Sequence, residues 1–367
     1  MSTDSTGSSR VSTMAEIARR LGVSIASVSR VFNDQPGVSP ALRQRVLELS
    51  TELNYAPHGS ARGLATTQTH TVAFLTVHRS LPLDEDYFYQ RIMLGAQHEL
   101  SRHGYYLLIS TIESDQLGDL ASLRLLRERR VDGVILAGPE IPPRPIVALQ
   151  GMRVPLVLVD NSLPHSAVDC VLSEDENGGY AATRHLLDHG HTAIAALSGP
   201  QGWPSNQARL QGYRQAMAER NLPPLEVHGE ETTVESGRRT LTAALAQWPN
   251  LSALFAANDS MAMGAIRTAA AAGRRTPQEL AVIGFDDLDW AEHAHPPLTT
   301  VKVHKRRMGA VAARRLVDLL RGDDEAPIRS TVATTLIVRS SCGCPQAHPL
   351  SADANDSSAA PARQEQP

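Results

Sequence analysis

The chain begins with three short stretches in which hydrophobic residues recur at helical spacing. In the first, the apolar residues lie at i, i+3, i+4 and i+7, on one helix face: Met14, Ile17, Ala18 and Leu21. Thr13 and Glu16 have the T-x-x-E spacing of a capping box, which predicts that this helix begins directly after Thr13. Gly22 follows the stretch and can supply the turn that ends the helix.

Two further helices are predicted before Pro57. Ser24 is a suitable N-cap for a second helix, whose inner face carries the following apolar residues: Val28, Val31 and Phe32. Ser39 followed by Pro40 is typical of the start of a third helix, whose apolar stripe is formed by Leu42, Val46, Leu49 and Leu53. Two short helices joined by a glycine-containing turn are typical of a helix-turn-helix, which we expect to span residues 12–57.

From residue 70 onwards the pattern changes to short apolar strands that alternate with helical stretches. Strands are predicted at 71–77, 105–110, 133–137 and 155–160, and in a second series at 193–199, 253–258 and 280–287. Helices are predicted between them, at 88–103, 175–189, 208–220, 235–246 and 260–272. This alternation predicts parallel sheets with crossover helices in two similar lobes, over residues 70–345. Ligands of such folds bind beyond the carboxyl ends of the strands, so we expect a cleft there.

Composition is that of an ordinary globular protein. The 367 residues are 42% hydrophobic and 20% charged, and no apolar run reaches the length of about 18 residues that a membrane span needs. Residues 1–11 and 346–367 are polar without periodicity, and we expect both tails to be disordered. Three cysteines cannot form a disulfide framework, which favours a reducing, cytoplasmic location.

Charge is distributed unevenly along the chain, although the net charge is only −4. Residues 1–66 contain seven arginines and five acidic residues, a net charge of +2, which leaves −6 for the remainder. A basic head on an acidic body is compatible with nucleic-acid binding by the head alone.

The predicted second helix has an exposed face that could enter the major groove of DNA. Ile25 and Ala26 lie at its N-terminal end, where they could touch base edges and thymine methyl groups. Arg30, one turn later, could donate to guanine or to phosphate, and Ser27 and Ser29 could donate to phosphate oxygens. The same helical pattern is also compatible with a small helical cap that has no role in DNA binding.

Several sequence runs resemble the lactose/galactose repressor (LacI–GalR) family of transcriptional regulators. The head contains GVSIASVSRVFN and NYAPHGSARGLA, and the body contains RVDGVILAG, HLLDHGHTAIAALSGP, FAANDSMAMGA and LAVIGFDD. The resemblance covers about residues 12–342. It implies a helix-turn-helix head joined to a two-lobed body like that of periplasmic sugar-binding proteins.

The resemblance assigns DNA-contacting roles to residues of the head. Ile25, Ala26 and Arg30 match the base-reading positions of the recognition helix. The positions that match contacts to the DNA backbone are Thr13, Ser24, Ser27, Ser29 and Asn33. Two residues depart from the family pattern, because Ser27 stands where threonine is usual and His58 where asparagine is usual.

Residues 58–66 match the hinge helix of the family. A nine-residue helix that contains Gly59 and Gly63 is not stable alone in water, because nucleation is costly. The resemblance implies that it folds when two copies pair over the DNA minor groove. Leu64 then matches the leucine that wedges between central base pairs, and Arg62 supplies a phosphate contact or minor-groove charge. A flexible linker with Leu64 packed on the body is the alternative.

The resemblance also assigns ligand contacts in the cleft of the body. The seven matching residues are Phe88, Tyr89, Asp160, Trp203, Arg209, Asn258 and Asp286. The Asp286 carboxylate could accept hydrogen bonds from vicinal hydroxyl groups, and Trp203 is a candidate for stacking on a sugar face. For three neighbouring residues a structural role is favoured, with Asp259 and Asp287 as helix caps and Phe255 in the core.

Other reactive residues do not form a recognisable catalytic or metal-binding motif. His185, His189 and His191 lie close together, but no motif such as HExxH is present, and we expect no metal. Cys342 and Cys344 are interpreted as surface thiols. Neither a G-x-G-x-x-G nor a G-x-S-x-G motif occurs, so we expect no cofactor and no enzymatic activity.

The resulting hypothesis is a cytoplasmic, homodimeric repressor of carbohydrate-utilisation genes. It would bind a palindromic double-stranded DNA operator and leave it when a small sugar binds the cleft, without any membrane association. A purine-type corepressor is the alternative within the same class. An architectural DNA-binding protein without an effector, and an enzyme tethered to DNA by its head, are the alternatives from other classes.

Overall fold

The computed structural model describes residues 13–32, 35–55, 68–77, 87–113, 115–163, 168–322 and 326–344. Several predictions lie outside these residues: the tails at 1–11 and 346–367, the hinge at 58–66 with Arg62 and Leu64, and Asn33 of the head. Among the described residues, no helix is both long and apolar enough to cross a membrane.

The head consists of the three predicted helices, α1 (Met14–Leu21), α2 (Ile25–Phe32) and α3 (Pro40–Glu52). The Thr13 hydroxyl accepts a hydrogen bond from the backbone N–H of Glu16, so α1 begins where the capping pattern predicts. Gly22 ends α1 with a φ of 63°, a left-handed conformation that glycine adopts at little cost. Ile17, Val28 and Val46, one from each helix, are fully buried and form the small core.

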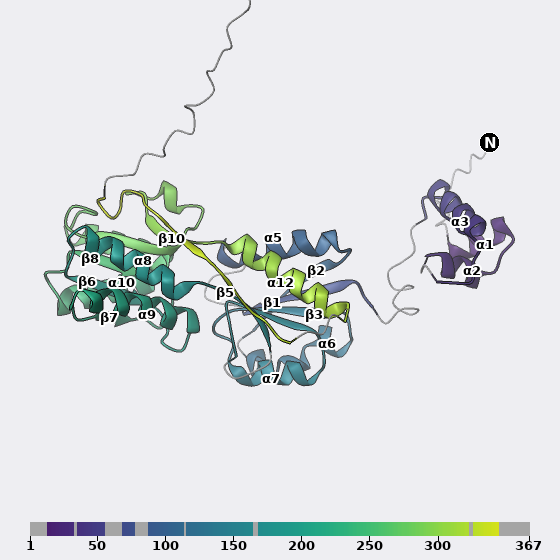
Figure 1. Cartoon of the computed structure of the whole chain (residues 1–367), viewed down its shortest axis with the longest axis horizontal. Helices are drawn as coiled ribbons and strands as arrows, with labels where there is room; N and C mark the ends of the chain where they lie inside the picture. The colour runs from purple at the N-terminus through teal and green to yellow at the C-terminus, as the bar shows by residue number, and fades with distance from the viewer. Residues whose placement is uncertain are drawn as a thin grey trace, which may run out of the picture.

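The body contains two six-stranded sheets, as shown in Figure 1. The first lobe has the strand order β11-β5-β4-β3-β1-β2, with bounds β1 (Thr71–Val77), β2 (Tyr106–Ile112), β3 (Gly133–Ala137), β4 (Leu156–Val159), β5 (Asp169–Ser173) and β11 (Arg329–Val332). The second lobe has the order β12-β10-β9-β8-β6-β7, with bounds β6 (Ile194–Ser198), β7 (Leu225–His228), β8 (Ala253–Ala256), β9 (Ala281–Asp286), β10 (Thr299–Val303) and β12 (Thr334–Ile337). Only the β10–β12 pair is antiparallel among the described strand pairs, so the predicted parallel α/β class is confirmed.

Helices cover both sheets. The first lobe carries α5 (Tyr87–Arg102), α6 (Arg124–Arg127), α7 (Pro143–Gly151) and α12 (Lys305–Leu320). The second lobe carries α8 (Asp175–Asp188), α9 (Pro204–Glu219), α10 (Val234–Gln247) and α11 (Asp259–Ala271). Short 3-10 turns lie at Gln116–Gly118, Leu120–Ser122 and Ala291–His293.

The chain passes between the lobes three times, which the two strand series in the sequence did not predict. It enters the second lobe between β5 and α8, returns to the first between β10 and α12, and crosses again between β11 and β12. In Figure 1 the yellow segment that contains both last strands crosses from the first lobe to the second. The lobes are therefore joined by three short segments. This arrangement allows the lobes to rotate relative to each other about the three connecting segments.

Glycine pairs bring the principal helices of each lobe into close contact. In the first lobe, a Cβ added at Gly95 of α5 would overlap the carbonyl oxygen of Arg306 on α12, and Gly309 has the corresponding place on α12. In the second lobe, Gly179 of α8 and Gly212 of α9 form the same kind of contact. The two helices of each pair pack against each other, and the similarity of the two pairs shows that the lobes are built alike.

Candidate functional site

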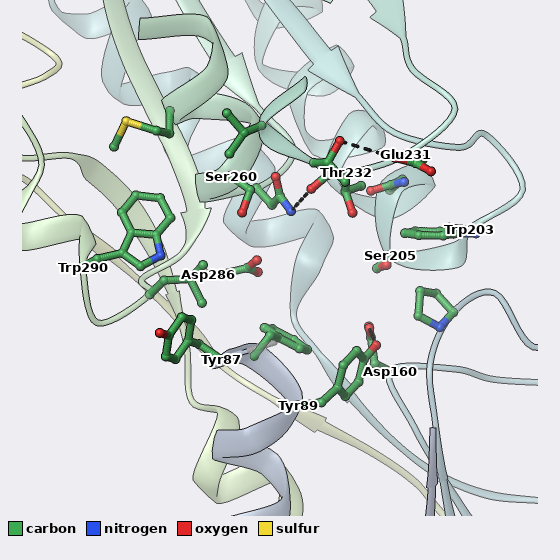
Figure 2. Close-up of a pocket in the computed structure, with 18 of the residues that line it drawn as sticks. Tyr87, Tyr89, Asp160, Trp203, Ser205, Glu231, Thr232, Ser260, Asp286 and Trp290 are labelled. Atoms are coloured by element: carbon green, nitrogen blue, oxygen red, sulfur yellow. Dashed lines mark hydrogen bonds between the residues drawn. The ribbon is translucent and has the colours of Figure 1, made fainter. Parts of the chain in front are cut away.

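A cavity of about 1120 Å³ lies between the two lobes, where the strands of both sheets end. All seven residues predicted for the cleft line this cavity. Phe88, Tyr89 and Asp160 come from the first lobe, and Trp203, Arg209, Asn258 and Asp286 come from the second. The prediction that these residues meet at one place is therefore correct, and Figure 2 shows several of them around the opening.

Two aspartates end corresponding strands and face the cavity. Asp160 follows β4 with a φ of 54°, and Asp286 is the last residue of β9 with a φ of 110°. Positive φ is uncommon for residues other than glycine, and such conformations cluster at ligand-binding sites. The side chains of both residues are largely buried, so their carboxylates are presented inward and not to bulk solvent.

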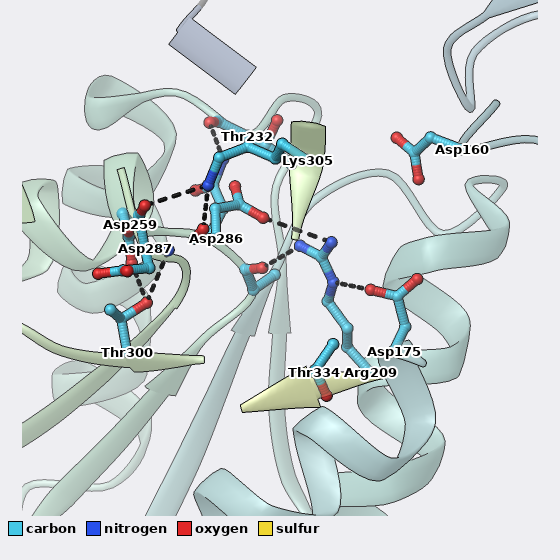
Figure 3. A network of polar contacts seen from close by, with 12 residues as sticks. Asp160, Asp175, Arg209, Thr232, Asp259, Asp286, Asp287, Thr300, Lys305 and Thr334 are labelled. Atoms are coloured by element: carbon cyan, nitrogen blue, oxygen red, sulfur yellow. Dashed lines mark hydrogen bonds and ion pairs between the residues drawn. The ribbon is translucent and has the colours of Figure 1, made fainter. Parts of the chain in front are cut away.

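Arg209 is held by the protein in three places. Its Nε donates to Asp175 at 2.8 Å, one Nη donates to the carbonyl oxygen of Ala257 at 2.6 Å, and the other lies 3.5 Å from Asp286. Helix α9 begins at Pro204, so Arg209 lies in its second turn and not at its start, as the predicted range 208–220 implied. Arg209 therefore positions the Asp286 carboxylate as well as bordering the cavity, as shown in Figure 3.

Burial and charge act on the pKa of Arg209 in opposite directions. Burial lowers it, but the carboxylates of Asp175 and Asp286 raise it above its usual value. The guanidinium carbon also lies 3.9 Å from the centre of the Phe285 ring, a stabilising cation–π contact. Arg209 is therefore a permanent positive charge beneath the cavity.

Tyr89 and Phe88 form the wall that the first lobe contributes. The Tyr89 hydroxyl donates to Oδ2 of Asp160 at 2.8 Å, and both groups are buried. The rings of Phe88 and Tyr89 meet edge to face with their centres 5.1 Å apart. The hydrogen bond fixes the orientation of the Asp160 carboxylate before any ligand is bound.

Asn258 has a structural role in addition to its place on the cavity wall. Its side-chain oxygen accepts from the backbone N–H of Met261 at 2.8 Å and caps α11, and its amide donates to the carbonyl oxygen of Thr232 at 2.9 Å. The cap of α11 is thus Asn258, and the prediction that Asp259 caps a helix is wrong. Asp287 forms ion pairs with Arg339 and Lys302. Phe255 lies in the core as expected.

Asp259 lies fully buried behind the cavity. Its carboxyl accepts hydrogen bonds from the Thr300 hydroxyl at 2.5 Å and from the Leu288 backbone N–H at 2.8 Å. Burial and the nearby charge of Asp286 raise its pKa to about 8, despite those two hydrogen bonds. The Lys305 ammonium donates to the backbone carbonyl oxygens of Asp286 and Asp287, and burial lowers the pKa of this amine.

The cavity also contains residues that the sequence analysis missed. Trp290 and Tyr87 lie at one end, opposite Trp203, with Asp286 between them in Figure 2. Further hydroxyl and carboxyl groups line the cavity, contributed by Glu140, Ser205, Glu231, Thr232, Thr233 and Ser260. Trp290 lies three residues after the FDD run that contains Asp286, and this proximity in sequence was the signal available.

On the head, the residues predicted to read bases lie on an open surface. Ile25 is 53% exposed although it is a large apolar residue, and Ala26 and Arg30 are also exposed. The Ser24 hydroxyl oxygen accepts from the Ser27 backbone N–H at 3.1 Å and lies 2.9 Å from the Ser27 hydroxyl. This confirms the predicted N-cap and places both hydroxyls at the N-terminus of α2.

The interpretation of Cys342 and Cys344 as surface thiols is wrong. Their exposed fractions are 2% and 8%, and the Thr299 hydroxyl donates to the Cys342 sulfur at 3.2 Å. The segment that carries them lies against the second lobe. The Ser341 hydroxyl accepts a hydrogen bond from the backbone N–H of Thr299 and donates one to the backbone carbonyl oxygen of Val282.

Comparison with known proteins agrees with this architecture. Residues 13–58 match the family of bacterial regulatory proteins described as the lacI family, and residues 183–342 match a periplasmic binding protein-like domain. The HTH-type transcriptional regulator CelR of Thermobifida fusca is 36% identical over 337 residues, which cover 90% of this chain and 98% of that protein.

Two solved structures are similar over nearly their whole length. A complex of the transcriptional regulator CelR with cellobiose is 34% identical with a TM-score of 0.69, and covers 90% of this chain and 99% of that one. A Lac repressor dimer bound to operator and the anti-inducer ONPF is 26% identical with a TM-score of 0.78. The match covers 91% of this chain and 99% of that one. The expected fold class and the expected family resemblance are both confirmed.

Proposed function

Because the chain belongs to the lacI family of bacterial regulatory proteins and is a DNA-binding transcriptional regulator, we propose that it is a repressor that a short saccharide releases from its operator. The observation that carries this proposal is the cavity, in which aromatic rings stand at both ends of a polar middle section. The seven cleft residues are proposed as the ligand contacts.

The lining suits a ligand with many hydroxyl groups and apolar ring faces. Asp160 and Asp286 offer fixed acceptors for vicinal hydroxyl groups, and Trp203 and Trp290 offer stacking surfaces. A cavity of about 1120 Å³ is somewhat larger than ordinary small-molecule pockets, which have about 300–1,000 Å³. We therefore propose a disaccharide or a slightly longer oligosaccharide. Cellobiose bound to a similar regulator is consistent with this class.

The head supports the DNA-binding part of the proposal. Ile25, Ala26 and Arg30 would contact base edges in the major groove, because α2 presents them without obstruction. The matching backbone contacts are Thr13, Ser24, Ser27, Ser29 and Asn33. Arg62 and Leu64 of the hinge are proposed to act in the minor groove, with Leu64 as the wedge.

We propose that the protein acts as a homodimer. Strand β2 is the last strand of its sheet, and it exposes Tyr106, Leu108 and Ile109, with Tyr106 as much as 75% exposed. Leu94 of the neighbouring α5 is 46% exposed. An apolar strand edge of this kind favours burial against a second copy, and a two-fold dimer requires a palindromic operator.

Ligand binding would act through the angle between the lobes. Arg91 of α5 forms an ion pair with Asp289 in the second lobe, so lobe rotation changes at least one direct contact. A rotation would alter the distance between the two hinges of a dimer and weaken their pairing on DNA. Such coupling amounts to about 1–3 kcal/mol and is reciprocal. No covalent step is needed, and we propose that the saccharide leaves unchanged in the cytoplasm.

A ligand screen tests the proposal. Thermal shifts are measured with monosaccharides, disaccharides and purines, and operator release is followed by fluorescence anisotropy. We expect one disaccharide class to raise the Tm and to release DNA. A purine that tightens operator binding would instead identify a corepressor, and no response to any compound would favour an architectural protein.

A pair of variants makes the screen specific for the cavity. Trp203→Ala should weaken the response to the disaccharide, whereas Gln207→Ala, on the exposed side of the helix α9 that begins directly after Trp203, should not. An equal response of both variants would show that the ligand binds elsewhere.

A further inference from the structure

Three potential metal ligands from distant parts of the sequence meet at the surface of the second lobe. His185 and His189 lie one turn apart near the end of α8, and Cys344 lies in the segment that follows β12. Their ligand atoms are all within 4.8 Å of one another. His189 is exposed, His185 is half-buried and Cys344 is buried, so solvent can reach the cluster from the side of His189.

The hydrogen bonds of the two histidines leave ring nitrogens available. Nδ1 of His189 lies 2.7 Å from the carbonyl oxygen of His185, which places the proton on Nδ1 and the lone pair on Nε2. A backbone acceptor of this kind is the usual second partner of a histidine that binds a metal. Nε2 of His185 is buried and makes no hydrogen bond to the described residues.

We propose that His185, His189 and Cys344 bind a Zn²⁺ ion, with the fourth position open to solvent beside His189. Zinc prefers nitrogen and sulfur ligands in a tetrahedral arrangement, with distances of about 2.0–2.1 Å to nitrogen and about 2.3 Å to sulfur. The ligand atoms, which now lie within 4.8 Å of one another, therefore have to approach by about 1 Å, which requires small adjustments of all three side chains.

The ion would join two segments that are far apart in the sequence. Helix α8 begins the second lobe, whereas Cys344 ends the described chain after its third passage between the lobes. A hydrogen bond close to Cys344 already holds this segment against the second lobe, because the Ser341 hydroxyl donates to the backbone carbonyl oxygen of Val282 at 2.6 Å. Zinc binding would thus stabilise the end of the body against the lobe core.

Metal content and a cobalt spectrum test the proposal on the full-length, reduced protein. The protein is stripped with a chelator, supplied with Zn²⁺ and passed through gel filtration. We expect one zinc ion retained per chain and a Tm increase of about 5 °C or more at saturation. With Co²⁺ in place of Zn²⁺, we expect an absorption band from thiolate-to-metal charge transfer.

Three variants separate this site from adventitious binding. Cys344→Ser should abolish the charge-transfer band, and His189→Ala should abolish metal retention without unfolding the protein, because this ring is exposed. His191→Ala is the matched control, since His191 bonds to Ser252 outside the cluster. Metal lost on gel filtration, a missing thiolate band, or equal retention by His189→Ala would overturn the proposal. None of these results depends on DNA or saccharide binding.

Discussion

Asp160 and Asp286 occupy corresponding positions in the two lobes. Strands β4 and β9 are each third in their sheets, and both aspartates stand where these strands end, with φ values of 54° and 110°. Tyr89 holds the first carboxylate and Arg209 the second. Each lobe thus presents an aspartate whose carboxylate is held in place by another side chain. One ligand can therefore donate hydrogen bonds to a fixed carboxylate of each lobe.

The first prediction concerns Asp286→Asn. We expect the change to weaken saccharide affinity by about 10- to 100-fold, because a hydrogen bond to a charged group contributes about 1.5–3 kcal/mol. Operator affinity without ligand should stay within about twofold of the original. Calorimetric titration and operator anisotropy measure the two quantities. Asp318→Asn, outside the cavity, is the control, and an unchanged inducer response of Asp286→Asn would contradict the cleft assignment.

The second prediction concerns pH. Burial raises the pKa of Asp259 to about 8, so between about pH 4 and pH 8 the folded state holds a proton that the unfolded state has released. Folding stability should therefore fall as pH rises through this window, by up to about 1.4 kcal/mol per pH unit. In Asp259→Asn this contribution disappears, so denaturation between pH 5 and pH 8 should show a flatter profile. A profile parallel to that of the unchanged protein would show that Asp259 titrates normally.

The head and the cleft could be predicted from the sequence for different reasons. Local patterns determine the head, because the Thr13 and Ser24 caps and the Gly22 turn act within a few residues. The position of the cleft could be predicted because strand ends meet at one edge of a parallel sheet, whereas its individual residues, such as Asn258 and Asp286, were identified through the family resemblance.

The parts that escaped prediction depend on contacts between distant segments. Strands β7 and β12 are four residues each and only half-buried, so they lack the continuous apolar run that marks the central strands. The return of α12 to the first lobe depends on its packing against α5, which no local pattern encodes. Burial of Cys342 and Cys344 likewise depends on where the last segment lies, and short C-x-C spacing carries no such information.

The third prediction concerns Arg30→Ala on the open face of α2. A contact to a base edge contributes about 1–3 kcal/mol of discrimination, so the variant should lose sequence preference as well as affinity. Binding is measured on the operator and on a scrambled duplex at one salt concentration. Arg20→Ala is the control, because Arg20 pairs with Glu16 on α1. An equal loss on both duplexes would make Arg30 a phosphate contact.

The fourth prediction concerns Gly95→Ala at the α5–α12 contact. A methyl group there would overlap the backbone of Arg306, so we expect a loss of about 1–3 kcal/mol in unfolding free energy. Gly151→Ala at the end of α7 is the matched control, because nothing lies within 4 Å of its added Cβ. Urea denaturation compares the two. Equal stability of both variants would show that the two helices can move apart without cost.

The fifth prediction uses Trp290 to test the length of the ligand. Trp203 and Trp290 border opposite ends of the cavity, so a single sugar ring can stack on only one of them. Trp290→Ala should therefore weaken disaccharide binding by about 5- to 30-fold, the equivalent of about 1–2 kcal/mol. It should leave the weaker binding of a monosaccharide at the Trp203 end unchanged. If both ligands lose affinity equally, Trp290 shapes the whole cavity and does not serve a second sugar ring.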